Sequence, residues 1–357
     1  SVSLVAGQSP TLDFSLRDPD PSRPQLYVSR PGDAYSRYAD TTGTASLGHA
    51  LHGIANVAQG DMRQLLAAID WTPRDGSGVR RALHQLGPEA YDASARASLG
   101  QQSEFTVLLL RRMLAGEQAR QAARAAGSVQ DSPEAGLWQA WATPYGAASW
   151  QGDHGGASGW NSAGVGLLAG MDRHFDSGLS LGFHLALAAR RTTINGAHDA
   201  SADTQSALAG LQGLLAPEQW DGFYLTAQAR LGMEQGEMDR NVNIGDAYLR
   251  HNESRWTGLT GSAMLGGGKD WSRQFESGSL SAGPLGWLEY AFLRRPGFTE
   301  EDGQASRLRV DDSLYDSLLL SLGAHAGWNV ALENGSTLGL DMLAAWRHEL
   351  LDGTFRT

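Results

Sequence analysis

The stretch LSLGFHLALAAR, at residues 179–190, decides the fold of this chain. Apolar side chains stand at every second position, and the residues between them are small, polar or charged: Ser180, Gly182, His184, Ala186, Ala188 and Arg190. This period of two predicts a β-strand whose two faces meet different surroundings. At about 3.3 Å per residue the strand is about 40 Å long, whereas most globular strands have about six residues. The stretch therefore predicts one strand of a transmembrane β-barrel, with its small and polar residues facing the lumen.

We expect nine strands, because eight further segments show a comparable pattern: 137–145, 165–174, 206–215, 222–234, 256–271, 280–294, 318–330 and 338–349. The predicted connections alternate in length. Four are short turns, at 176–178, 217–222, 272–278 and 333–336. Four are long and polar, at 150–162, 192–204, 235–255 and 295–311. Short turns at one end and long loops at the other are typical of outer-membrane barrels, whose short turns face the periplasm.

The composition excludes several classes of protein. With 28 basic and 39 acidic residues the net charge is −11, and a nucleic-acid-binding protein would need a basic surface. No cysteine is present, so the chain has neither a disulfide framework nor a thiolate metal site. The sequence contains no run of about eighteen apolar residues, so it predicts no membrane-spanning helix. Barrel strands escape such a search because half of their residues are polar.

The first hundred residues are expected to change from strands to helices. Residues 1–45 contain short strand-like segments, and we interpret them as the end of a β-rich region. Apolar residues spaced three or four apart then predict two helices separated at Gly60, with Asp61 as the N-cap of the second. A third helix is expected to end at Leu86. We assign residues 46–100 to a helical junction.

One long helix is predicted from Glu89 to Ala126, because this segment lacks proline and consists mainly of strong helix formers. Such a helix is about 57 Å long. Its second half has too few apolar residues for a lipid-facing or core helix. We expect residues 101–134 to form a linker helix through the pore, with four arginines available to the surrounding wall: Arg111, Arg112, Arg120 and Arg124.

Several stretches together resemble the C-terminal β-domain, or translocator, of classical (type Va) autotransporters. GLWQAWATPYGAASW at 136–150 is similar to the first strand of that family, and residues 162–188 are similar to the second and third. GPLGWLEYAFLRRPGFTEEDG at 283–303 matches best, with family positions at Pro284, Glu289, Phe298 and Glu300. AYSRYADTTGTASLGHAL, which begins at residue 34, resembles the helical junction between passenger and barrel.

The resemblance implies a mainly β fold, in which residues 135–357 form a transmembrane antiparallel barrel behind a helical junction and a helix in the lumen. The family's barrel has twelve strands, so we expect the last three or so to be missing and the sheet to keep an open edge. The implied function is insertion into the bacterial outer membrane, with secretion and surface anchoring of an N-terminal passenger. The junction is then expected at the cell surface.

The resemblance also implies partners. These are outer-membrane lipid and lipopolysaccharide, periplasmic chaperones, the barrel-assembly machinery and the chain's own passenger, with no nucleic acid. We expect a monomer whose open edge is available for pairing with another chain. Two alternatives remain open: a porin-like outer-membrane channel, and a membrane anchor for a passenger enzyme such as a protease or esterase.

The alternation assigns side chains to the two faces of the predicted wall. Eight polar residues are expected to face the lumen: Asp172, His184, Arg230, Glu234, Glu289, Asp341, Arg347 and Glu349. Seven apolar residues are expected to face lipid: Leu181, Phe183, Leu185, Leu187, Leu225, Leu320 and Leu322. In a confined lumen we expect the helix arginines to pair with the inward carboxylates, because ion pairs are stronger there than on a surface.

No catalytic residue, cofactor or metal is expected. His184, His325 and His348 are interpreted as polar filler of the lumen, since no second ligand stands at a recognisable spacing. GGGKD at 266–270 is not a phosphate loop, and its glycines are expected to make room for the occupant of the lumen. The linker sequence of self-cleaving family members is not matched around residues 120–135, so we expect no self-cleavage.

Overall fold

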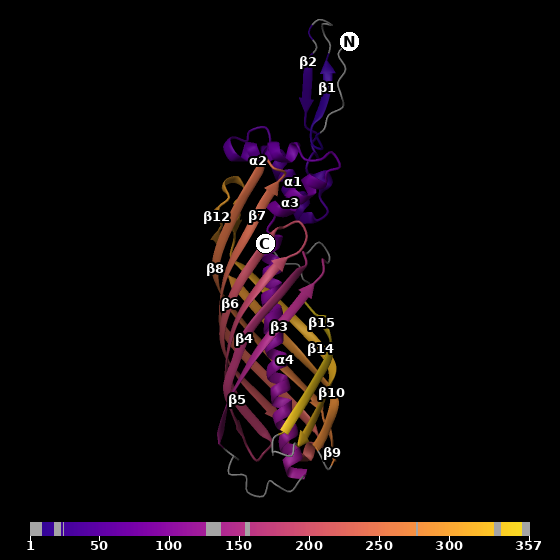
Figure 1. The fold of residues 1–357 in the computed structure, drawn as a ribbon, viewed down its shortest axis with the longest axis vertical. Coiled ribbons are helices and arrows are strands. Elements are labelled where there is room, and N and C mark those ends of the chain that lie inside the picture. Colours follow the sequence, from indigo (N-terminus) through magenta and orange to yellow (C-terminus); the bar gives the residue numbers. More distant parts are fainter. Residues whose placement is uncertain are drawn as a thin grey trace.

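The computed structural model describes residues 9–17, 23, 25–125, 137–153, 158–275, 278–331 and 337–351. Along the chain it contains a small hairpin, three short helices, one long helix and a large antiparallel sheet that curls round the long helix (Figure 1). The hairpin and the short helices lie at one end of the sheet, which we call the junction end. The opposite end of the sheet is called the turn end.

The N-terminal part agrees with the expected change from strands to helices. The hairpin is followed by three helices, with these bounds: β1 (Asp13–Arg17), β2 (Gln25–Ser29), α1 (Thr42–Ile54), α2 (Gly60–Asp70) and α3 (Ser77–Leu86). A short 3-10 helix, Ser36–Tyr38, precedes α1. The strand-like segment LVAG, predicted near the N-terminus, lies outside the described residues.

The cap residues of the first two helices differ from each other. The Thr41 hydroxyl accepts a hydrogen bond from the Thr44 backbone N–H at 3.0 Å and so caps α1. The prediction that Asp61 caps α2 is wrong, because Gln59 occupies that position without a side-chain hydrogen bond. The Asp61 carboxylate instead accepts a hydrogen bond from the Tyr248 hydroxyl at 2.7 Å, which ties α2 to the sheet.

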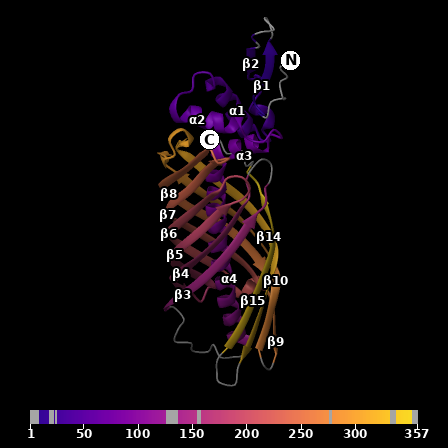
Figure 2. The same ribbon diagram turned by 45° about the horizontal axis from the view of Figure 1, so that its top comes forward.

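The mainly β fold with nine long strands, predicted from the alternation, is confirmed. The strands follow one another in sequence order, each antiparallel to the next: β3 (Trp138–Gln151), β4 (Trp160–His174), β5 (Leu179–Ile194), β6 (Ala200–Leu215), β7 (Phe223–Ile244), β8 (Tyr248–Lys269), β10 (Gly278–Arg295), β14 (Ser313–Ala331) and β15 (Thr337–Glu349). Figure 2 shows them tilted and wrapped round a common axis. Among the described strands, β3 and β15 each pair with a single neighbour in the sheet.

Short strands and 3-10 helices complete the connections. β9 (Trp271–Phe275) pairs with β10, and β12 (Glu301–Asp302) pairs with β8 at the junction end. β11 (Phe298–Thr299) pairs with β13 (Arg309–Val310) within the β10–β14 connection. Two further 3-10 helices are found at Glu218–Trp220 and Gln304–Ser306.

Burial along β5 alternates from residue to residue. The even-numbered residues from Ser180 to Ile194 are buried, while Phe183 and Leu185 on the other face are 44% and 58% exposed. The buried face points toward α4 (Glu89–Ala125), which runs inside the curled sheet (Figure 1). We call this enclosed space the lumen and the curled sheet the wall. Among the described residues, no helix combines the length and the hydropathy needed to span a membrane.

The predicted long loop at residues 235–255 is wrong. β7 and β8 each continue for 22 residues, and only residues 245–247 separate them. The extra length forms a hairpin above the rest of the sheet, and its inner face packs on the short helices through Val242, Ile244 and Tyr248. In the sequence this hairpin resembles a loop because its outer residues are polar. Its apolar residues face the short helices instead of lipid.

Candidate functional site

The interface between α4 and the wall is the candidate functional site. α4 contacts strands from β4 to β15, so the polar residues of the inner face meet a helix instead of bulk solvent. Two apolar clusters fix its depth. Phe105 and Leu109 pack against Leu168 and Leu208 of the wall. Nearer the turn end, a second cluster joins α4 to the wall: Leu110, Met113, Leu114, Leu214, Tyr224, Met264, Leu285 and Trp287.

Hydroxyl groups of α4 bind the carboxylate of Glu289 on β10. The Ser103 hydroxyl donates to one carboxylate oxygen at 3.1 Å, and the Thr106 hydroxyl donates to the other at 2.7 Å. Arg230 on β7 donates to the backbone carbonyl of Gln102 at 3.3 Å and also contacts the Thr106 hydroxyl. A buried carboxylate and a buried guanidinium thus share one turn of the helix, which satisfies groups that would be costly to leave unpaired.

Two ion pairs of opposite polarity join α4 to the first strands. Arg112 of the helix pairs with Asp172 on β4, and its guanidinium lies 4.1 Å from the centre of the Trp141 ring. Glu104 of the helix pairs with Arg190 on β5. The wall therefore presents both an anion and a cation to the same helix, so a rotation of α4 would separate both pairs.

Near the turn end, polar side chains of α4 contact the wall. The Gln118 side-chain amide donates to Asp270 at 3.2 Å, and the Arg120 guanidinium donates to the Ser180 hydroxyl at 3.1 Å. A polar cavity of about 320 Å³ lies beside Arg112 and Arg120. This cavity is large enough to hold water beside the helix.

At the junction end a second buried network joins α4, β7 and the β10–β14 connection. Arg240 pairs with Glu300 at 2.6 Å, and the Tyr91 hydroxyl donates to the same carboxylate at 2.7 Å. Arg295 pairs with Glu234 at 3.2 Å and donates to the backbone carbonyl of Tyr91 at 3.2 Å. The first turns of α4 are thereby held directly by Arg295 and, through Glu300, by Arg240.

The predicted pairing of helix arginines with wall carboxylates is only partly realised among the described side chains. Arg112 does pair with Asp172. Arg111 donates instead to the backbone carbonyl of Asp341 at 2.9 Å. Arg120 pairs with Glu117 of its own helix, and the side chain of Arg124 lies outside the described residues.

The other predicted lumen residues have partners within the wall. His184 is buried, and its ring hydrogen-bonds to Gln212 at 2.8 Å. Arg347 is exposed on β15, with its guanidinium 5.9 Å from the Trp287 ring. Glu349 accepts a hydrogen bond from the Ser317 hydroxyl at 2.5 Å.

Two expectations about the lumen are wrong. His348 pairs across the sheet with Leu320 and stacks on Trp346, which places it on the outer face. Gly266 and Gly268 do not make room for the helix, because a side chain at either position would collide with wall atoms around Trp287 and Tyr224. Gly327 does adjoin α4, since a Cβ atom there would collide with Gln118.

The seven residues predicted to face lipid lie on the outer face of the sheet. Leu320 is partly exposed, and the other six are exposed: Leu181, Phe183, Leu185, Leu187, Leu225 and Leu322. Glu104, Thr106 and Arg295 also contribute to this interface, although the sequence pattern did not predict them. The inward alternation of Glu289, Ala291 and Leu293 continues to Arg295. This alternation could have predicted that Arg295 belongs to the strand.

Residues 140–357 match a family model described as the autotransporter beta-domain. No curated protein matches the chain. Among solved structures, the translocator domain of the autotransporter NalP from Neisseria meningitidis is 16% identical, with 65% of this chain and 82% of that chain covered and a TM-score of 0.43. The β-domain of the Bordetella autotransporter BrkA is 17% identical, with 60% and 80% covered and a TM-score of 0.43.

Proposed function

This chain belongs to the autotransporter β-domain family, and from that premise we propose that α4 connects the passenger to its anchor through the lumen. As a member of that family the chain is a translocator, a barrel that serves the secretion of a passenger. Such domains belong to the outer membrane and are not themselves catalytic. We propose that this chain likewise belongs to the outer membrane and catalyses no reaction of its own.

The observation that carries the proposal is the course of α4 inside the wall. The helix has 37 residues and is therefore about 55 Å long, whereas the apolar band of an outer-membrane barrel is about 25 Å tall. It begins beside the junction helices and ends near the turn end (Figure 1). A segment with this course can join a domain on one side of the membrane to a strand that begins on the other.

The helix also fits the lumen chemically. Its contacts with Glu289, Arg190 and Asp172 are specific and distributed over several turns. An incidental contact would not satisfy buried charges on strands that lie far apart round the wall. These contacts support a resting state with the helix in place, and they favour a plugged translocator over an open porin-like channel.

The proposal also gives the molecule an orientation. The short connections at 175–178 and 216–222 lie at the turn end and face the periplasm, so the junction helices lie at the cell surface. The barrel then contacts lipid and lipopolysaccharide as a monomer, after delivery by periplasmic chaperones and the barrel-assembly machinery. α4 is continuous across the predicted division at residue 100, so we place the start of the linker helix at Glu89.

Single cysteines test this orientation, because the chain has none of its own. Val57, between α1 and α2, is 73% exposed, and the side chain of Asp221 in a short turn is 94% exposed. On intact cells that display the full-length protein, we expect a membrane-impermeant maleimide to label V57C and to spare D221C. D221C should react once the outer membrane is permeabilised. Labelling of D221C alone on intact cells would reverse the orientation.

A further inference from the structure

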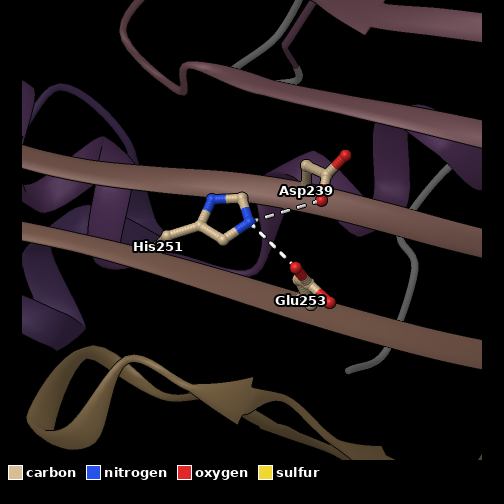
Figure 3. A group of neighbouring side chains, drawn as sticks. All are labelled: Asp239, His251 and Glu253. Atoms are coloured by element: carbon tan, nitrogen blue, oxygen red, sulfur yellow. Dashed lines mark hydrogen bonds and ion pairs between the residues drawn. The ribbon is translucent and has the colours of Figure 1, made fainter.

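A group of three metal-ligating side chains lies on the outer face of the β7–β8 hairpin, away from the lumen. Asp239 is on β7, and His251 and Glu253 are on β8 (Figure 3). One ligand atom from each residue lies within 4.8 Å of the other two. The hairpin rises toward the junction helices, so the group stands at the end of the sheet where the long connection of β10 also lies (Figure 1).

The distances within the group suit a small divalent cation. The His251 Nε2 atom is 3.2 Å from a carboxylate oxygen of Glu253 and 3.5 Å from one of Asp239. A metal about 2.1 Å from an imidazole nitrogen and from a carboxylate oxygen holds those atoms about 3–3.5 Å apart at tetrahedral or octahedral angles. The three side chains therefore already stand at the separation that metal coordination requires.

A fourth residue, outside the group, orients the imidazole. The His251 Nδ1 atom hydrogen-bonds to the Asn241 side-chain oxygen at 2.9 Å. Because that oxygen accepts only, Nδ1 carries the proton, and in the neutral ring the Nε2 lone pair points at the two carboxylates. Metal-ligating histidines are commonly oriented in this way by a second hydrogen bond. A lone pair of Nε2 that points at two carboxylates favours the binding of a cation between these groups.

The sheet register adds negative charge to the same place. Asp239 stands directly opposite Glu253, and Glu301 on β12 stands opposite Glu253 on its other side. Like charges in directly opposed positions destabilise a sheet. The nearby Arg255 guanidinium pairs with Glu237 at 3.1 Å, one step further along the hairpin. This arrangement gains stability from a bound cation.

We propose that Asp239, His251 and Glu253 bind Zn²⁺ and so clasp β7 to β8 above the membrane. One imidazole with two carboxylates is a donor set that zinc accepts, whereas calcium and magnesium prefer oxygen ligands alone. The side chains are 45%, 49% and 37% exposed, so water completes the coordination and the ion exchanges readily. The site is independent of α4 and of secretion, because none of its residues faces the lumen.

Zinc binding by the full chain, folded in detergent micelles without a histidine tag, tests the proposal. Equilibrium dialysis with metal analysis is compared for the wild type, H251Q, the double variant D239N/E253Q and the control H49Q, which removes an exposed histidine on α1. We expect the wild type and H49Q to bind one more zinc ion per chain than the other two. We also expect zinc affinity at that site to fall about tenfold or more in H251Q.

A second measurement separates zinc from a proton, the other cation that fits between these groups. In the nitrogen NMR spectrum, the ring signals of wild-type His251 should shift on zinc addition. Equal zinc uptake by the wild type and H251Q would overturn the proposal. A protonated ring that ignores zinc would overturn it as well and would make the group a set of ordinary ion pairs.

Discussion

Arg112 and Asp172 show how single residues hold α4 in the lumen. Their side chains are 29% and 7% exposed, and the Trp141 ring covers the guanidinium from one side. Breaking a buried ion pair costs more than the pair contributes, because the remaining charge keeps its desolvation penalty. Water in the adjacent cavity lessens that penalty for Arg112. The pair therefore serves mainly to select one rotation of the helix.

Replacing Arg112 by glutamate sets two carboxylates against each other. We expect R112E to lose about 1–2 kcal/mol of folded-state stability, less than a fully buried pair loses, because Arg112 keeps some contact with water. The heat-modifiability transition on unboiled gels should move to lower temperature, and single-channel conductance should rise. The swap R112E/D172R should recover most of the loss.

The exposed pair Arg191 and Asp203 provides the matched control for this prediction. It lies on the outer face of β5 and β6, with side chains 65% and 56% exposed. R191E should shift the transition by much less than R112E, because surface pairs contribute little. If R112E behaved like R191E in both stability and conductance, the role of α4 as a plug would be refuted.

At the scale of elements, α3 depends on contacts with the β5–β6 connection. His198 in that connection is 3% exposed and stacks edge-on against His84 of α3, with ring centres 5.5 Å apart. Its Nε2 atom lies 2.5 Å from the Ser158 hydroxyl oxygen. Burial, followed by electrostatic repulsion from His84 and Arg240, lowers the pKa of His198 to about 4. The docked junction thus requires a neutral His198.

This lowered pKa predicts that acid weakens the junction. The unfolded side chain, with a pKa near 6.5, binds a proton before the folded one does, so stability is complete above pH 6.5 and falls as the pH drops toward 4. Between pH 7.5 and pH 5 we expect a loss of about 2 kcal/mol. Thermal unfolding followed by tryptophan fluorescence measures it. H198N should lessen the loss between pH 7.5 and pH 5 by about 2 kcal/mol relative to the wild type, and an undiminished slope in that variant would exclude His198 as a source of it.

The whole molecule inverts the usual arrangement of a soluble protein. Large apolar side chains such as Leu185, Leu211 and Leu265 are exposed on the outer face, whereas charged groups such as Arg230 and Glu289 are buried inside. An outer apolar face suits lipid, and a polar inner face needs either water or a polar occupant. α4 supplies that occupant with hydroxyls, amides and charges on several sides.

The enclosure of α4 predicts a pattern of proteolysis for the whole chain. In the detergent-folded protein, trypsin should cut first near the junction surface, at Arg80 and Arg81, which are exposed on α3. Arg96 and Arg112 of α4 should survive much longer, since they lie half-buried inside the curled sheet. Mass spectrometry of timed digests checks the order, and the boiled chain should be cut at all four sites. Early cutting at Arg112 in folded protein would place α4 outside the wall.

Several features of this chain follow from local pattern. The period of two in 179–190 and its neighbours is enough to predict nine strands and to place Leu181 outside and His184 inside, because a strand alternates its side chains regardless of its partners. Helix-forming composition likewise predicts the long helix, which the structure describes from Glu89 to Ala125. The family resemblance also lies in such local stretches, and the match over residues 140–357 confirms it.

The contacts inside the lumen do not follow from local pattern. α4 carries polar and apolar residues on all sides, so its sequence does not specify its rotation or depth, and hence not which carboxylate meets Arg112. The full length of β7 and β8 was not predicted for a related reason. Helices from a distant part of the chain stabilise the polar ends of these strands. Pairings between distant segments depend on how the sheet curls round the helix, and that geometry arises from long-range packing.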